Sequence, residues 1–484
     1  MRWIKLFSFL CFCQISFAQE LSIHKQHKQE FGLKEKHESL FDKSGADIIP
    51  LQKTRALKKA IFGYLPDWEY ISGRNNLKYD LLSHIAAFDF SVSKEGNISN
   101  PSYWPWTDVI NLAHQNGVKI ILCAVNFNQS ELTYLLSNDT AKQNFFNQLK
   151  IKLAQYKLDG VNIDFEDLKT ADRGEVLNKF MLDLSQFLKI QNPNYEISFA
   201  GPPVNWGGWN LSGLASSCDY IFIMGYNFYG SWSLTTGASS PLLGGNYNIS
   251  NTVNTQYGAL SNNLKQKLIL GIPYYGSKWI AKTQNSHASV LSYVSSTRYR
   301  TDYDLARQLG VLWADDNKTP WYRWQISNTS WGQVWFDNDT SLGLKYSLAD
   351  ANNYFGVGMW ALNYDGALPQ LWNELKKRYF TTSVDEVAEI KNDDFILYQN
   401  FPNPFNGSTM INYKLSSGGK ITLKVFDLLG REKFILINNV SHITGSYKFN
   451  FDANQFGLSS GNYFFQLLFD NRKSVRIKKF IYLK

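Results

Sequence analysis

The chain has 484 residues, of which 44% are hydrophobic and 19% are charged. This length allows two or three domains with buried cores, and the low charged fraction argues against a mostly disordered chain. A net charge of +8 over so many residues, with no Arg-rich stripe interleaved with aromatics, does not support nucleic-acid binding. Aromatic residues make up 15%, and every Trp after Trp3 lies between Trp68 and Trp372. Aromatic side chains either pack in hydrophobic cores or provide flat faces on which planar or ring-shaped ligands stack.

Residues 1–18 are predicted to be a secretory signal peptide. Basic Arg2 and Lys5 precede an apolar run over residues 6–12, and Ser16-Phe17-Ala18 has the small-x-small pattern of a cleavage site. The apolar run is too short for a transmembrane helix, so we expect an exported, soluble protein. Cleavage removes two of the four Cys residues, and the remaining Cys123 and Cys218 are expected to be buried free thiols rather than a disulfide.

Residues 19–59 are rich in Lys, Glu and His and are predicted to be a polar spacer. His24 and His27, three residues apart, suggest a metal site as the alternative. No further ligand pattern accompanies them, so a solvated spacer is the preferred interpretation.

Short apolar runs then alternate with helical patterns. The runs cover residues 61–66, 83–90, 118–124, 159–166, 195–201, 219–225, 267–273 and 356–362, and helices are predicted over 140–157, 173–190 and 341–354. Continuous apolar strands alternating with helices indicate a parallel sheet covered by helices. Eight such units predict an α/β fold, a (β/α)₈ TIM barrel over residues 60–380. A doubly wound sheet is the alternative, but no glycine-rich phosphate turn follows the first strand.

The segment between the seventh and eighth strands, residues 274–355, is longer than one crossover requires. It contains six Trp residues and is predicted to be an insertion that forms a wall beside the active face. A polar linker is expected over residues 381–394. Residues 395–484 then show period-two strands separated by Gly, Asn and Ser turns, which predicts a C-terminal β-sandwich.

The fourth predicted strand reads DGVNIDFE over residues 159–166. Successive side chains of a strand point to opposite faces, so Asn162, Asp164 and Glu166 share one face, towards the barrel axis. Barrel interiors are normally filled with branched aliphatic side chains, and buried polar groups cost stability unless they are hydrogen-bonded or used. Glu166 comes last, at the carboxyl end of the strand, where barrel enzymes carry their chemistry. A helix-capping acid or a surface ion pair does not explain this alternation.

Two carboxyl groups that approach closely do not both ionise at low cost, so one is expected to hold a proton near neutral pH. A protonated Glu166 can donate that proton to a leaving-group oxygen. An ionised Asp164 one step deeper can orient or stabilise a neighbouring group. Acid-assisted cleavage of a glycosidic bond suits this pair, and the aromatic residues can stack on sugar rings.

The DGVNIDFE segment resembles the DGxDxDxE signature of glycoside hydrolase family 18, the chitinase family. Other strand ends are similar to further motifs of that family. Met224-Gly225-Tyr226-Asn227 matches M-x-Y-D/N on strand six, Gly358-Met359-Trp360 with Tyr364-Asp365 matches G-x-W…YD on strand eight, and Phe62-Gly63-Tyr64 matches the aromatic opening of strand one. The resemblance covers about residues 60–380.

The resemblance implies substrate-assisted, retaining hydrolysis, in which the 2-acetamido group of the substrate is the nucleophile. It assigns the catalytic roles to Glu166 as general acid and base, to Asp164 as the partner of the acetamido N–H, and to Tyr226 as the partner of the acetamido carbonyl. Further substrate-binding or supporting positions are Trp360 as the floor of the sugar subsite, Asn227 against the bound sugar, Asn162, Tyr64, and Asp159 at the start of strand four.

One position departs from the family pattern, because Asn162 stands where the signature has Asp. Active branches of the family that act on cell walls and spore cortex also have Asn there, so activity is still expected, but a proton relay through this position is in doubt. Chitin and chito-oligosaccharides are the first expected substrates. Peptidoglycan, N-glycan cores, and a non-catalytic surface carbohydrate-binding role remain the alternatives.

The tail opens with FILYQNFPNPFNGST and resembles the type A C-terminal sorting domain of the type IX secretion system. This implies a route across the outer membrane to the cell surface or the medium, with the secretion machinery as a partner; an adhesive or sugar-binding sandwich is the alternative. No cofactor is expected. No metal site is indicated either, since Asp337-Asn338-Asp339 lacks the other ligands of a calcium loop. The chain is expected to act as a monomer on an N-acetylglucosamine-containing polysaccharide, without nucleic acid and without a membrane span.

Overall fold

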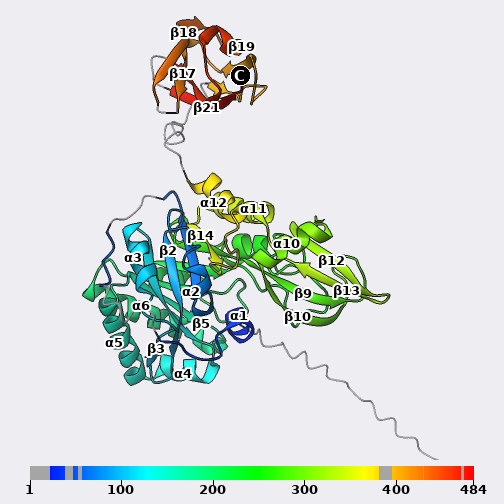
Figure 1. The fold of residues 1–484 in the computed structure, drawn as a ribbon. Coiled ribbons are helices and arrows are strands. Elements are labelled where there is room, and N and C mark those ends of the chain that lie inside the picture. The colour runs from blue at the N-terminus through cyan, green and yellow to red at the C-terminus, as the bar shows by residue number, and fades with distance from the viewer. Residues whose placement is uncertain (1–21, 39–46, 53–56, 381–394, 429, 470–473) are drawn as a thin grey trace, which may run out of the picture. The chain divides into compact units, whose positions relative to one another are not determined.

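A computed structural model describes residues 22–38, 47–52, 57–380, 395–428, 430–469 and 474–484 of the chain (Figure 1). Eight parallel strands form a closed barrel, as predicted. They are β1 (Ala60–Pro66), β2 (His84–Val92), β4 (Lys119–Asn126), β5 (Gly160–Phe165), β6 (Glu196–Gly201), β7 (Tyr220–Met224), β8 (Leu268–Pro273) and β14 (Gly356–Trp360). Closure follows from strand β1, which pairs with both β2 and β14. A two-residue strand, β3 (Ile98–Ser99), pairs in antiparallel with the last residues of β2.

Helices follow the strands and cover the barrel. They are α2 (Asp67–Gly73), α3 (Thr107–Gln115), α4 (Gln129–Ser137), α5 (Asp139–Gln155), α6 (Glu175–Gln191), α7 (Leu211–Ser217), α8 (Ile249–Asn251), α9 (Asn262–Lys265), α11 (Asp339–Ala351) and α12 (Gln370–Tyr379). Side-chain caps define where several of them begin. Asn128 caps α4 and Asn138 caps α5, each by accepting a backbone N–H that has no partner within the helix.

The centre of the barrel is filled by the ring of Phe222. Added Cβ atoms on Gly271 and Gly358 would lie only 2.2 and 2.4 Å from this ring, so only glycine fits at these two positions. Phe222 in turn packs edge-on against Tyr64, with the ring centroids 4.8 Å apart. The glycines on two strands therefore let one large ring support the residues above it.

The insertion between β8 and β14 is a five-stranded antiparallel sheet with one helix (Figure 1). Its elements are β9 (Tyr275–Ala281), β10 (Val290–Arg298), α10 (Tyr299–Leu309), β11 (Leu312–Ala314), β12 (Thr319–Ser327) and β13 (Ser330–Trp335). Three of its Trp residues are buried in a core of their own, with Trp321 and Trp335 stacked at 5.1 Å and Trp279 beside them. Half of the six tryptophans in this predicted wall are therefore packing groups of the sheet.

The C-terminal unit, which begins at Phe380, consists of two antiparallel sheets around an apolar core. One sheet contains β15 (Phe395–Leu397), β16 (Ser408–Leu415) and β19 (Gly445–Asp452); the other contains β17 (Gly419–Asp427), β18 (Glu432–His442), β20 (Gly461–Phe469) and β21 (Ser474–Tyr482). Inward-facing residues such as Ile421, Leu423 and Val425 alternate with more accessible ones, which is the period-two pattern of the sequence. The predicted linker, residues 381–394, lies outside the described residues.

The N-terminal segment differs from expectation. Residues Ile23–Phe31 form a helix, α1, and the side chains of His24 and His27 are fully buried (Figure 1). The interpretation of these two histidines as part of a solvated spacer is therefore wrong. The predicted signal peptide, residues 1–18, lies outside the described residues.

Two other expectations concern burial and membranes. Cys123 and Cys218 are buried and unpaired, as predicted. In the described part of the chain, no helix is both long enough and apolar enough to cross a membrane.

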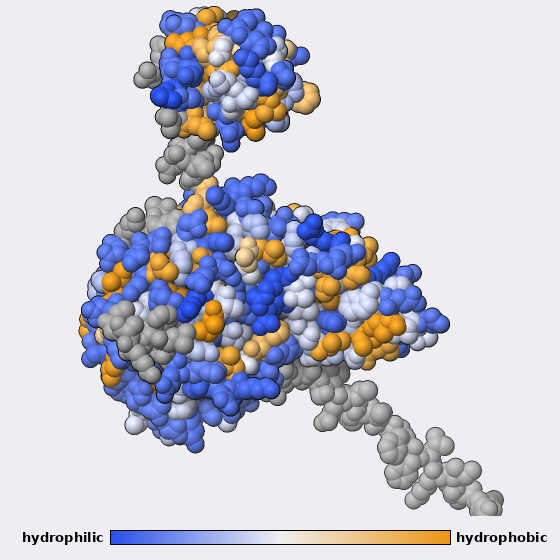
Figure 2. Space-filling model, viewed as in Figure 1, coloured by the Kyte–Doolittle hydropathy of each residue, from blue (hydrophilic) through white to orange (hydrophobic). Residues whose placement is uncertain are grey.

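Figure 2 shows hydrophilic and hydrophobic residues interspersed over the viewed face.

The segment Asp337-Asn338-Asp339 forms the start of α11 rather than an ion-binding loop. Asn338 caps the helix in a reciprocal pair with Ser341, and the carboxylate of Asp337 forms a buried ion pair with Lys345. Both charged side chains are almost inaccessible to water.

Replacing Lys345 by Met should lower the free energy of unfolding by about 3–5 kcal/mol, because it leaves the Asp337 carboxylate buried without its counter-ion. The double variant Lys345→Met/Asp337→Leu removes both charges and should recover part of that loss. Chemical denaturation of the three chains measures this. Equal losses in the single and double variants would show that the unpaired charge is not the cause.

Candidate active site

Strand β5 places its polar row as its alternation predicts. Phe165 packs against Phe145 of α5 and Phe180 of α6, so the odd-numbered side chains face the helices. Asn162 and Asp164 are fully buried on the opposite face, and Glu166, directly after the strand, has 13% of its side chain exposed. Asn162 thus lies deep inside the barrel, and Glu166 lies at its mouth.

Asn162 is held between two neighbouring strands. The hydroxyl of Tyr64 on β1 donates to its Oδ1 at 2.8 Å, and its Nδ2 donates to Ser198 Oγ on β6 at 2.9 Å. An amide in this position neither gains nor loses a proton near neutral pH, so it acts as a fixed dipole below Asp164. The expected doubt about a proton relay at residue 162 therefore has a structural basis.

Helix α1 lies directly over the carboxyl groups. His24 Nδ1 is 2.7 Å from Asp164 Oδ2 and 3.2 Å from Glu166 Oε1, and His24 Nε2 is 3.0 Å from the hydroxyl of Tyr226. Ser22, the N-cap of α1, donates from Oγ to Glu166 Oε1 at 2.7 Å. All three residues expected to be catalytic are therefore brought together, and each is in contact with the N-terminal segment.

Trp360, at the end of β14, forms the wall on which His24 rests. Its indole is fully buried, and its centroid is 3.8 Å from that of the imidazole at an interplanar angle of 31°. The indole Nε1–H donates to His27 Nδ1 at 2.9 Å. Phe88 and Trp68 pack against the edges of the same indole. The indole of Trp360 thus lies beside the carboxyl groups and is covered by two histidines of α1.

The electrostatics of the site are those of a buried ion pair. Burial alone lowers the pKa of His24, but the carboxylates of Asp164 and Glu166 outweigh it and raise this pKa to about 9. Burial raises the pKa of Asp164 to about 6 even though the imidazolium opposes the rise. The sequence predicted that one of the two carboxyl groups has a raised pKa, and in the structure this group is Asp164. Between about pH 6 and 9, Asp164 is ionised and His24 is protonated.

His27 has the opposite character. Burial and the positive charges of His24 and Arg298 hold its pKa well below the usual value. A neutral ring fits its contacts, because Nδ1 accepts from both Trp360 Nε1 and the hydroxyl of Tyr364. The two histidines of α1 thus carry different charges in the same site.

His24, Asp164 and Glu166 also form a set of three ligand-type atoms within 4.8 Å of one another. Ligand atoms around a tetrahedral zinc ion are about 3.3 Å apart, given metal–nitrogen and metal–oxygen distances of about 2.0 Å. The separations of 2.7 and 3.2 Å in this set are those of hydrogen bonds. The geometry thus fits an ion pair better than an ion site.

A groove of about 710 Å³ leads away from Glu166 on the other side of α1. Its lining includes Tyr226 and Asn227 and the indoles of Trp206, Trp209 and Trp232. Trp206 is 42% exposed. Ser22 and Ile23 also line this groove, whereas the space over Trp360 is filled by His24.

The structure does not bring Asp159 to this site. It lies before the first residue of β5, at the opposite end of the strand from Glu166, and accepts hydrogen bonds from His114 and from the backbone N–H of Ile120. There it lines a separate cavity of about 830 Å³. Its position suits support of the strand and not contact with a ligand held by Glu166.

Sequence reasoning missed Ser22, His24 and His27. A signal was present, because Ile23, His24, His27 and Phe31 recur at helical spacing after a Ser in an N-cap position. The polar composition of the surrounding residues concealed it.

Comparison with known families agrees with this geometry. The model described as glycosyl hydrolases family 18 matches residues 60–365, which is more than half of the chain. The chain belongs to glycosyl hydrolase family 18. A second model, described as a secretion system C-terminal sorting domain, matches residues 399–483 and indicates type IX secretion to the outer surface or beyond. This family 18 enzyme therefore has a carbohydrate substrate and an export domain.

Its relatives are distant. A putative sporulation-specific glycosylase, YdhD, of Bacillus subtilis is 24% identical over 311 residues, covering 62% of this chain and 69% of that protein. Human di-N-acetylchitobiase is 24% identical over 309 residues, covering 56% and 76%. Among solved structures, the Group IV chitinase of Ostrinia furnacalis has a TM-score of 0.58 at 18% identity and covers 66% of this chain and 98% of that one. The Bacillus cereus spore cortex-lytic enzyme SleL has a TM-score of 0.54 at 19% identity, covering 69% and 77%. Both structural likenesses concern the fold.

His24 should remain protonated far above the pH at which an exposed histidine titrates. Its pKa in the docked helix, about 9, exceeds the ordinary value of 6.5, so the imidazolium stabilises docking fully below pH 6.5. That contribution is lost as the pH rises through 9. NMR titration of labelled imidazole rings, with the His24 signal assigned by its loss in a His24→Gln chain, measures this. A midpoint near 6.5 would mean that His24 does not face the two carboxylates in solution.

Proposed function

We propose that the enzyme hydrolyses β-1,4-linked N-acetylglucosamine polymers, first chitin and chito-oligosaccharides, with retention of configuration at the anomeric carbon. The observation that supports this most directly is the set of three polar groups around one aromatic floor. Asp164 and Tyr226 both lie within hydrogen-bond reach of a single ring placed over Trp360, and Glu166 lies at the rim where the groove begins.

In the proposed first step, the carboxyl proton of Glu166 passes to the glycosidic oxygen and the bond from this oxygen to C1 breaks. The carbonyl oxygen of the substrate's acetamido group forms a new bond to C1, which gives an oxazolinium-like cation. Asp164 accepts the acetamido N–H and balances the positive charge, and Tyr226 donates to the carbonyl oxygen. No side chain becomes bonded to the sugar.

In the second step, the ionised Glu166 removes a proton from water, whose oxygen bonds to C1 as the bond to the acetamido oxygen breaks. Glu166 thereby regains its proton, and two inversions at C1 retain the configuration. Asn162 is fixed by Tyr64 and Ser198 at the base of the site. Its place in the groove lining supports the proposal that Asn227 contacts a bound sugar. Trp206, Trp209 and Trp232 provide faces on which further sugar rings can stack.

Peptidoglycan is the second candidate substrate. The relatives named as a sporulation-specific glycosylase and a spore cortex-lytic enzyme support it, as does Asn162 in place of the family's Asp. Parallel assays on chitotetraose and on purified peptidoglycan distinguish the two, since they differ in the lactyl and peptide substituents that the groove must accept.

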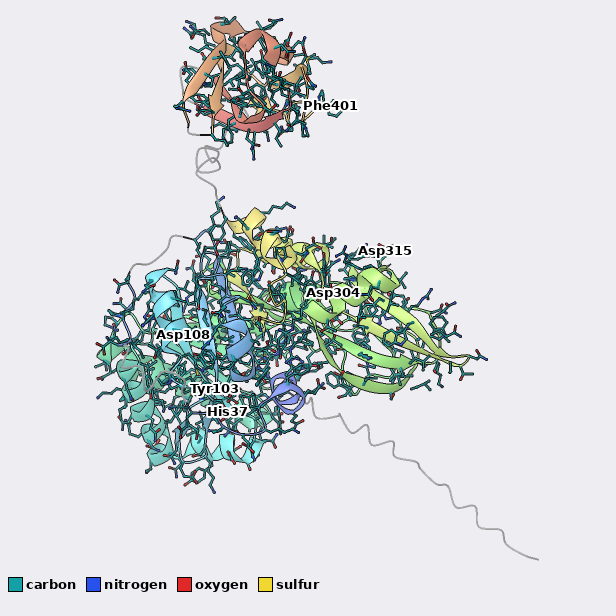
Figure 3. The ribbon with its side chains drawn as sticks, in the orientation of Figure 1. His37, Tyr103, Asp108, Asp304, Asp315 and Phe401 are labelled. Carbon is teal, nitrogen blue, oxygen red and sulfur yellow. The ribbon has the colours of Figure 1, made fainter. Side chains whose placement is uncertain are left out.

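Glu166→Gln should lower the turnover of chitotetraose by about 10²–10⁴-fold, because an amide cannot supply the proton to the leaving oxygen. Binding of the oligosaccharide should change little. Asp304→Asn, on an exposed residue of α10 (Figure 3), is the matched control and should keep full activity. Since α1 contacts Glu166, all chains are assayed after brief trypsin treatment, which cuts at the exposed Lys34 and Lys36. Undiminished turnover in Glu166→Gln would remove the proposed mechanism.

A fully deacetylated glucosamine tetramer should not be cleaved. It has the same linkage and ring as chitotetraose but has no acetamido carbonyl to attack C1, so the proposed nucleophile is missing. Product analysis by mass spectrometry compares the two tetramers at equal concentration. Cleavage of both at similar rates would instead require a nucleophile on the protein or a direct attack by water.

A further inference from the structure

Helix α1 has the contacts of a specifically bound ligand. Ser22, Ile23, His24 and His27 are buried, although the same stretch also contains the exposed Lys25, Lys28, Gln29 and Glu30. The buried side chains point into the site, and the exposed ones face away from it. A short amphipathic helix is marginal on its own in water, so its packing against the site accounts for its formation.

The insertion holds the other end of the helix. Gln26 Nε2 donates to the hydroxyl of Tyr293 at 2.8 Å and to Ser296 Oγ at 3.2 Å, and Glu30 Oε2 accepts from the backbone N–H of Ser296 at 2.9 Å. The guanidinium of Arg298 lies 4.0 Å from the ring centroid of Phe31. In addition, Lys28 forms an ion pair with Asp89, which follows Phe88 on β2. Side chains along the whole nine-residue helix therefore contact β2 or β10.

The imidazole of His24 takes the contacts that the proposed function assigns to the acetamido group. It reaches Asp164 through one nitrogen and the hydroxyl of Tyr226 through the other, and it lies on Trp360 as a sugar ring is expected to. As an imidazolium it also has the charge of the oxazolinium-like intermediate. Ser22 occupies Glu166 Oε1, an oxygen of the group that must give its proton to the substrate.

The segment after α1 keeps the helix close to the site. Its exposed residues 33–38 include His37, whose ring stacks on Tyr103 with the centroids 5.0 Å apart and the planes at 2° (Figure 3). The backbone carbonyl of His37 also accepts from the N–H of Tyr103. A ligand tethered this closely competes at an effective concentration on the order of millimolar, so soluble substrate at lower concentration is at a disadvantage.

We propose that α1 is an autoinhibitory segment, which keeps the full-length enzyme inactive by occupying the sugar subsite over Trp360 with His24 and by holding Glu166 through Ser22. This inference rests on the proposed function, because it assumes that the sugar binds where His24 lies. Activity then requires that α1 leave the site, and cleavage within the exposed residues 33–38 releases it from its tether.

The test replaces His24 by Glu in the full chain, which sets a third carboxylate against Asp164 and Glu166 and should expel the helix. Two readouts are taken. The first, independent of any substrate, is the rate of tryptic cleavage after Lys25 and Lys28, which should rise at least tenfold because a docked helix resists the protease. The second is the turnover of chitotetraose, which should also rise at least tenfold. Gln29→Ala, on the exposed face of the same helix, is the matched control and should change both by less than twofold.

A measurement on the unmodified chain guards against poor folding of the variant. Brief trypsin treatment followed by removal of peptides should raise chitotetraose turnover at least tenfold, and a synthetic peptide of residues 19–38 should reverse the gain. The same peptide with His24 replaced by Ala should not.

The outcomes separate the two proposals. Suppose that the wild-type chain already cleaves chitotetraose and that freeing the helix does not raise this turnover. Autoinhibition is then overturned and the proposed function stands. If Lys25 and Lys28 of the wild-type chain are cut as fast as the exposed Lys34 and Lys36, α1 is not docked and autoinhibition is again overturned. If the freed chain cleaves no acetamido sugar at all, the proposed function fails, and the inference that rests on it fails with it.

Discussion

Two carboxyl groups at the end of β5 lie where water has little access, and the charge of at least one of them has to be balanced. Asp164 is fully buried and Glu166 nearly so. An ion in such surroundings costs several kcal/mol unless a counter-charge or a set of hydrogen bonds offsets the loss of hydration. In this structure the imidazolium of His24 is that counter-charge. In the proposed reaction the same place is taken by a cationic intermediate, so one electrostatic requirement explains both what fills the site at rest and what the site stabilises during catalysis.

The rest of the barrel keeps these groups in position. Phe222 fills the centre beside two glycines, Tyr64 rests on Phe222, and Asn162 is fixed between Tyr64 and Ser198. Because the amide of Asn162 does not titrate, the pKa of Asp164 depends on burial and on whatever lies above it. Because the burial of Asp164 is fixed by the barrel, its pKa depends mainly on which group lies above it.

The insertion has a role that its aromatic composition does not suggest. Three of its six tryptophans pack in a core of their own, while β10 presents Tyr293, Ser296 and Arg298 to α1. The groove lined by Trp206, Trp209 and Trp232 belongs instead to the loops after β6 and β7. The two sides of Glu166 therefore differ. One is an open groove lined by three indoles, and the other binds a segment of the same chain.

Much of this was determined by the sequence itself. Each of the eight barrel strands lies where an apolar run predicted it, since such runs reflect burial on both faces of a parallel strand. The period of two along residues 159–166 placed Asn162, Asp164 and Glu166 on one face, because strand geometry is local. Only the tertiary structure decided what meets that face. His24 and Asp164 are 140 residues apart. The helical spacing of residues 22–31 indicates one face that can be buried, but nothing local in the sequence shows which surface that face packs against. The same reason applies at the other end of β5, where Asp159 belongs to the signature in sequence but faces His114 in space, because one strand carries its first and last residues to opposite ends of the barrel.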